Sequence, residues 1–303
     1  MLSIRSYAAR TGRTLLMAGV LGGALSACAS SGAKPAAEPE SAVRVLPPDD
    51  TPPPPPVDGM PSGFRTAFTA ADARARAAVY SNQCVATIVR MRAAGSFGPA
   101  AAAPKLLYCE RTADGVPLGG VFDVDSAFTR ARRLMVVRLD GARPRYTGAV
   151  DSVRVAQEAK LVRDITREVT PGMTKLGRVF RVVPMLQADG TLEAWVIPWP
   201  SLLRTAVLGG DIAMVRAADG RLRRIVDRTA TWKVVPVATS GPVVLTSTEH
   251  DVPAVADLVV ARGLADQGRE VTVTTAVARS ALVSGIDPTS GARLVWQHTL
   301  VTK

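Results

Sequence analysis

The chain has 303 residues, of which 47% are hydrophobic and 21% charged, and its formal net charge is +11. These proportions are typical of a globular protein and exclude a chain that is disordered or fibrous throughout. The sequence contains no Walker phosphate loop, no Gly-x-Gly-x-x-Gly turn, no His-Glu-x-x-His pair and no Gly-x-Ser-x-Gly elbow, so the commonest nucleotide-binding and hydrolase motifs are missing.

The first 28 residues predict an export signal. Three arginines and no acid precede the apolar run 15–21, which is too short to span a bilayer. The tetrapeptide Leu25-Ser26-Ala27-Cys28 then resembles the lipobox of bacterial lipoproteins. This resemblance implies that residues 1–27 are removed and that Cys28 is lipidated. Ala29 follows the cysteine in place of an aspartate, which by the same resemblance implies an outer-membrane protein of the cell envelope that faces the periplasm.

Residues 28–62 are predicted to be a tether, because they are small, polar and rich in proline and offer few large apolar side chains to bury. Five consecutive prolines at 52–56 favour a stiff polyproline II spacer. The tether is acidic, with a net charge of −3, and residues 63–303 have a net charge of +11. A basic domain favours anionic envelope components as partners. Alternatively, the arginines are scattered over the surface and have no partner. Nucleic acid is not an expected partner in an envelope.

A long amphipathic helix is predicted at 69–94, beginning with a capping box, Thr69-Ala70-Ala71-Asp72, and ending at Gly95. Cys84 lies on its apolar face. Because Cys28 is assigned to the lipid, Cys84 and Cys109 remain as an even pair in an oxidising compartment. This predicts a disulfide; the alternative is two buried thiols.

Strands are predicted at 121–124 and 134–139, followed by a turn at Asp140-Gly141. This region is dense in arginine, and the pattern indicates either an anion-binding strip or the solvated outer face of a hairpin. The candidate residues are Arg130, Arg132, Arg133, Arg138, Arg143 and Arg145.

A second helix is predicted at 154–169, with Thr170-Pro171-Gly172 ending it and the pairs Arg154–Glu158 and Lys160–Asp164 on its solvent side. Two hairpins follow, at 179–199 and 212–226. In the first, Trp195 and Trp199 share one face, which is consistent with a sugar-stacking platform or with a packed core.

The C-terminal part is predicted to contain strands at 231–237, 243–248 and 270–277, a short helix that starts near Pro253 and ends by Gly263, and a closing hairpin at 282–300. The order of Gly209-Gly210-Asp211, an Ala-Asp-Gly hairpin, a proline-started helix and a final hairpin resembles a group of uncharacterised exported proteins of Gram-negative bacteria. The resemblance covers about the last hundred residues and implies no known activity.

His250 is the only catalytic candidate that the sequence offers. It lies between Glu249 and Asp251, so it is a weak candidate for a general base; the alternative is a loop histidine that caps a helix. Adjacent residues of an extended chain point to opposite faces, so the three do not form a ready-made metal site. No metal site and no cofactor is predicted.

Taken together, these patterns predict an α+β domain at 63–303, with a largely antiparallel sheet built from hairpins and flanked by a few helices. We expect a lipid-anchored envelope protein with a non-catalytic binding or structural role toward an anionic envelope component or another envelope protein. The alternative is an envelope hydrolase that acts on a glycan, lipid or peptide through a site without a known motif. A deep cleft containing His250 or a carboxylate pair would favour the hydrolase.

Overall fold

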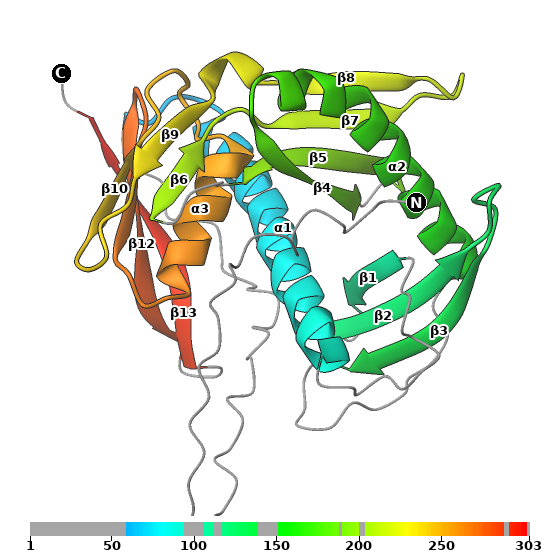
Figure 1. Ribbon diagram of the computed structural model, residues 1–303. Coiled ribbons are helices and arrows are strands. Elements are labelled where there is room, and N and C mark those ends of the chain that lie inside the picture. The colour runs from blue at the N-terminus through cyan, green and yellow to red at the C-terminus, as the bar shows by residue number, and fades with distance from the viewer. Residues whose placement is uncertain are drawn as a thin grey trace, which may run out of the picture. The chain divides into compact units, whose positions relative to one another are not determined.

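The computed structural model describes residues 59–93, 106–111, 117–138, 151–187, 190–199, 204–287 and 291–301 (Figure 1). Their α-helices are α1 (Phe64–Ala93), α2 (Ser152–Lys175) and α3 (Val255–Ala265). The strands are β1 (Leu106–Arg111), β2 (Pro117–Val124), β3 (Ala131–Arg138), β4 (Val179–Leu186), β5 (Leu192–Trp199), β6 (Thr205–Leu208), β7 (Ile212–Arg216), β8 (Leu222–Asp227), β9 (Lys233–Pro236), β10 (Val243–Thr246), β11 (Val271–Thr274), β12 (Ala278–Asp287) and β13 (Gly291–Leu300). The predicted lipobox, the signal peptide and the tether up to residue 58 lie outside the described residues. Residues 59–62, the predicted end of the tether, are described, and Met60 packs against the hydrophobic cluster that contains Phe64 and Phe68.

The predicted α+β class is confirmed, but the strands are divided among four sheets. Their orders are β1-β2-β3, β4-β5-β7-β8, β10-β11-β12-β13 and the pair β6-β9. All pairings are antiparallel except β10 with β11, which α3 connects as a crossover. Hairpins between neighbouring strands therefore build most of the fold, as their turn residues predict.

α1 begins at Phe64, five residues before the predicted start, and Thr69 lies inside it. The reason is that Phe64 and Phe68, one turn apart, are both buried, so the apolar face extends beyond the expected cap. Asp72 does not cap the helix; it is buried and receives two hydrogen bonds from Arg262 of α3, each 2.7 Å long, and one from the Trp296 indole. Asp72 therefore makes a long-range contact with α3 and β13 instead of the predicted local cap.

α2 also extends beyond its prediction, from Ser152 to Lys175, and Pro171 lies within it. Asp151 caps its N-terminus by accepting hydrogen bonds from the amides of Val153 and Arg154. Pro171 removes one amide donor, yet Val169 and Met173 on either side of it are buried, so packing of this face keeps the helix continuous. The expected stop at Thr170-Pro171-Gly172 was therefore wrong.

α1 contributes to two of the hydrophobic clusters. Phe64 and Phe68 at its start pack with residues of α3, β4, β5 and β10–β13. Cys84 and Ile88 near its end pack on Val121 of β2. In Figure 1, the middle of α1 passes between α3 on one side and the β1–β3 sheet on the other. This placement leaves the middle of α1 facing α2 and β4, where the candidate site lies.

Candidate functional site

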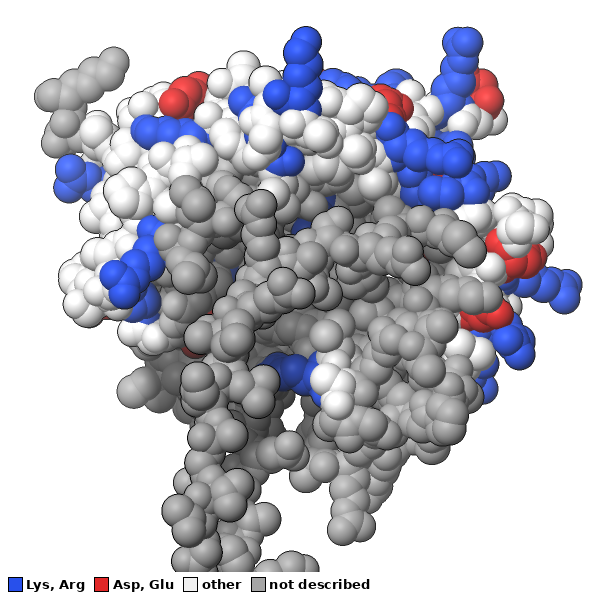
Figure 2. Space-filling model, viewed as in Figure 1, with Lys and Arg blue, Asp and Glu red and all other residues white. Residues whose placement is uncertain are grey.

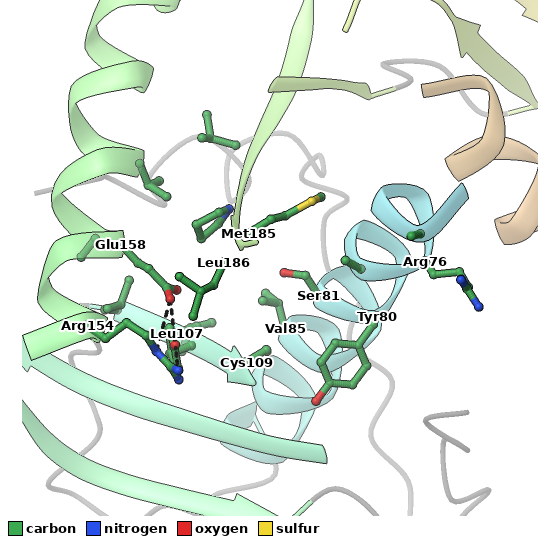
Figure 3. A pocket seen from close by; sticks show the side chains of 18 residues that line it. Arg76, Tyr80, Ser81, Val85, Leu107, Cys109, Arg154, Glu158, Met185 and Leu186 are labelled. Carbon is green, nitrogen blue, oxygen red and sulfur yellow. Dashed lines mark hydrogen bonds and ion pairs between the residues drawn. The ribbon is translucent and has the colours of Figure 1, made fainter. Parts of the chain in front are cut away.

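An open cavity of about 680 Å³ is lined by α1, α2, β1 and β4 (Figure 3). Its size falls within the range of about 300–1,000 Å³ that is typical of small-molecule sites. The two helices supply opposite walls, and Met185 and Leu186 lie at the end of β4 between them in Figure 3.

Most of the side chains that line the cavity are apolar. They come from all four elements: Ala73, Ala77, Val85, Leu106, Leu107, Ala159, Val162, Val182, Pro184, Met185 and Leu186. Such a surface stabilises a bound apolar group by removing it from water, at about 25 cal/mol per Å² of apolar area.

Polar side chains line both sides of the cavity: Arg76, Tyr80 and Ser81 come from α1, and a hydrogen-bonded cluster lies on the side of α2 and β1. The Tyr108 hydroxyl donates to Glu158 over 3.1 Å, and an Arg154 amino group donates to the Tyr108 oxygen over 3.3 Å. The Arg154 Nε atom lies 3.6 Å from the same Glu158 carboxylate. Figure 3 shows Arg154 and Glu158 projecting together from α2 toward β1. The cluster combines donors and an acceptor, so a polar group of a ligand has partners of both kinds.

Glu158 does not lie on the solvent side of α2 as predicted, because only 8% of its surface is exposed. The predicted i,i+4 pair with Arg154 does exist, but it faces the cavity. Asp164, in turn, pairs with Arg163 and Arg216. Helical spacing places Arg154 and Glu158 on one face, and only the packing of α2 against β1 shows that this face is covered.

A disulfide joins Cys84 of α1 to Cys109 of β1, with the Cα atoms 6.1 Å apart, which confirms the predicted pair. Cys109 also lines the cavity. The bond therefore fixes one edge of the site by tying the α1 wall to the β1 wall.

The candidate anion-binding arginines are described only in part. Arg130, Arg132 and Arg133 lie at the start of β3 or just before it, and Arg132 pairs with Asp123 over 3.0 Å. The side chain of Arg138, as well as Arg143, Arg145 and Cys28, lie outside the described residues. Figure 2 shows Lys and Arg spread over the visible face among several acidic side chains. The anion-binding strip stays a prediction.

The other sequence candidates lie away from the cavity. His250 is half-buried in the loop before α3 and is not among the residues that line the site. Trp195 is 4% exposed and donates its indole N–H to Glu193, so it belongs to the core and does not form an exposed platform with Trp199. Within the described ranges, no group of three His, Cys, Asp or Glu side chains is arranged to hold a metal ion.

One buried polar cluster was not predicted from the sequence. Asp211 is fully buried before β7, 3.7 Å from an Arg228 amino group, and neither carboxylate oxygen has a hydrogen-bond partner of good geometry in the described structure. Asp257 of α3, also fully buried, accepts from the amides of Gly209 and Ala254. Burial raises the pKa of Asp211 to about 6 and also raises the pKa of Asp257. Neither acid lines the cavity, so they are not placed to act on a ligand there.

Gly209 and the β6–β7 turn hold these two acids together. Gly209 has a φ of +59°, and a Cβ atom at this position would overlap the Thr231 carbonyl. The Gly209-Gly210-Asp211 motif therefore serves close packing of backbone against the segment before β9.

No protein-family model, curated protein or solved structure matches this chain. None of the helices in the described ranges is both long enough and apolar enough to cross a bilayer.

Proposed function

We propose that this protein is anchored to the cell envelope by a lipid on Cys28 and that its globular part binds an amphipathic small molecule without transforming it. The observation that supports this most is the cavity of about 680 Å³, whose lining is mostly apolar and contains a hydrogen-bonded cluster of Tyr108, Arg154 and Glu158. The ligand class that fits this pattern has an extended apolar body and a small polar group that meets Tyr108, Arg154 and Glu158. The lipobox supports the location.

The chemistry of the lining favours binding over hydrolysis. Among the residues known to line it, the cavity has one carboxylate, Glu158, one aliphatic hydroxyl, Ser81, and no histidine. Glu158 is on α2 with its own partners, whereas Ser81 is on α1, and no hydrogen bond links them in the described structure. A hydrolase needs a nucleophile, or a water, paired with a base. Among the described lining residues, the one hydroxyl paired with a carboxylate is Tyr108 with Glu158, and Arg154 contacts both groups, so we assign the three to ligand binding.

The binding proposal is tested by filling the cavity. We expect Ala77→Phe to place a ring in the apolar lining and to weaken binding of the hydrophobic fluorophore N-phenyl-1-naphthylamine by about ten-fold or more, because the ring occupies space that the probe needs. The matched control is Ala86→Phe. Ala86 is, like Ala77, an exposed position of the same helix, but it is not among the lining residues. Both variants are made in the full chain with Cys28→Ser, and binding is measured by fluorescence titration. Equal affinity of the two variants would contradict the proposed site.

A further inference from the structure

Three large aliphatic side chains are exposed next to one another. They belong to other segments of the chain than the predicted arginine strip. Leu176 just after α2 is 59% exposed, Val179 at the start of β4 is 40% exposed, and Val234 of β9 is 55% exposed. They line a hollow of about 300 Å³ together with Trp199 and Trp232, both half-buried. We call these five residues the apolar surface.

Basic groups border the apolar surface. The guanidinium carbon of Arg178 lies 4.6 Å from the centre of the Trp232 ring, and that of Arg181 lies 4.1 Å from the centre of the Trp199 ring. Lys175 and Lys233 are exposed next to Leu176 and Val234 in the chain. The two segments that supply most of this surface, 175–181 and 232–237, contain four basic residues and no acidic one. In Figure 2, Lys and Arg side chains project from the upper part of the visible face, where the end of α2 lies in Figure 1.

This combination favours a lipid bilayer over a protein as the occupant. Exposed aliphatic groups enter the headgroup boundary, tryptophan rings prefer that boundary, and basic side chains bind anionic headgroups while their stems stay apolar. The absence of acidic residues from both segments gives charge complementarity to an anionic surface. We propose that the apolar surface and its basic border dock the globular part onto an anionic bilayer. This contact is separate from the lipid on Cys28 and from the cavity.

Tryptophan fluorescence gives a local test. The chain has four tryptophans. Trp195 and Trp296 are buried at 4% and 3% exposure, which leaves Trp199 and Trp232 to report on the surface. The full chain with Cys28→Ser is mixed with vesicles of phosphatidylcholine and phosphatidylglycerol whose acyl chains are brominated. We expect quenching that unbrominated vesicles do not cause, that falls as salt is raised, and that is lost in the Trp199→Phe, Trp232→Phe double variant.

The matched variants separate this surface from any contact made by the N-terminal residues, which are identical in all of them. Replacing Leu176, Val179 and Val234 by serine should raise the lipid concentration at half-maximal quenching by about ten-fold or more. The control replaces three aliphatic residues exposed elsewhere by serine: Val89, Ile225 and Val244, which are 48%, 44% and 65% exposed. It should leave the lipid concentration at half-maximal quenching unchanged. Circular dichroism checks folding, and the single variant Val234→Ser provides the test should the triple variant fail to fold.

Quenching that is absent with anionic vesicles, or that is equal in the two triple variants, would overturn the proposal. A concentration-dependent dimer in analytical ultracentrifugation that the Leu176, Val179 and Val234 replacements abolish, without any vesicle quenching, would instead assign the surface to self-association.

Discussion

The ion pair between Asp72 and Arg262 is the residue-scale contact with the largest expected effect on stability. Both side chains are buried, and the Trp296 indole completes the set of donors to Asp72. Asp72→Ala leaves a buried guanidinium without its carboxylate, and we expect a loss of about 3–5 kcal/mol in the free energy of unfolding. Urea denaturation measures this loss.

A matched control for Asp72→Ala is available at an exposed pair. Arg132 is 74% exposed and contacts Asp123, so Arg132→Ala should cost less than about 1 kcal/mol. Similar losses in the two variants would show that the Asp72 contacts do not hold α1 to α3.

Asp211 predicts a specific dependence of stability on pH. Its pKa is about 6 in the folded protein and near 3.8 when exposed, so the folded state binds more protons between these values. Stability contributed by Asp211 is therefore lost as the pH rises from about 4 to 6, by about 3 kcal/mol in all. Asp211→Asn removes this loss, so relative to wild type it should be more stable at pH 7 than at pH 4.

The pH dependence of stability contributed by His298 has the opposite sign to that of Asp211, so wild type must be compared with Asp211→Asn. Burial lowers the pKa of His298 to about 4, so its contribution to stability rises with pH between about 4 and 6.5. The wild-type curve contains both slopes, and only the difference between wild type and Asp211→Asn isolates Asp211. If the free energies of unfolding of the two proteins differ by the same amount at every pH from 4 to 7, Asp211 does not have the raised pKa.

The role of a single residue could be predicted where it depends on residue type and number and not on the tertiary fold. The pairing of Cys84 with Cys109 follows from their number and from the expected compartment. The predictions for Asp72 and Glu158 were wrong for a shared reason. Asp72 has the spacing of a helix cap and Glu158 that of an exposed i,i+4 pair, whereas α3 and β1 cover them in the fold. Asp211 gave no signal, since its burial depends on α3, which begins 44 residues later.

At the scale of elements, the disulfide connects α1 to β1 across a sequence separation of 25 residues. Cys84→Ser with Cys109→Ser should lower the free energy of unfolding by about 3 kcal/mol, because the unfolded chain regains the freedom of that loop. Denaturation of the double variant measures this effect. Treatment of wild type with a reductant should reproduce it, whereas no difference between reduced and oxidised protein would mean that the bond does not constrain the unfolded chain.

Hairpins were easier to predict than helix ends. The turns at Gly190 and Gly220 both have glycine at positive φ, a local requirement that the sequence displays directly. The ends of α1 and α2 depend on apolar contacts with other elements, so the apparent cap at Thr69 and the stop at Pro171 were outweighed by packing. The cavity was not predicted, because its four walls come from elements between 73 and 186 that only the tertiary fold brings together.

At the scale of the whole molecule, the resemblance of Leu25-Ser26-Ala27-Cys28 to a lipobox predicts a lipid on Cys28. In cells fed a clickable fatty acid, Cys28→Ser should abolish incorporation into the protein, because the thiol is the acceptor that the motif requires. Undiminished incorporation in this variant would show that the anchor is elsewhere or absent. Membrane fractionation of wild type then tests the outer-membrane location.

Whether the cavity holds a molecule in the cell can be measured directly. Protein isolated from the envelope in mild detergent is analysed by native mass spectrometry, and the solvent extract of the same sample is analysed for small molecules. We predict that wild type and Ala86→Phe carry an amphipathic molecule beyond the covalent lipid, released on unfolding, and that Ala77→Phe does not. A wild-type mass that corresponds to the lipidated chain alone, or the same bound molecule in all three proteins, would contradict a ligand-binding role for this cavity.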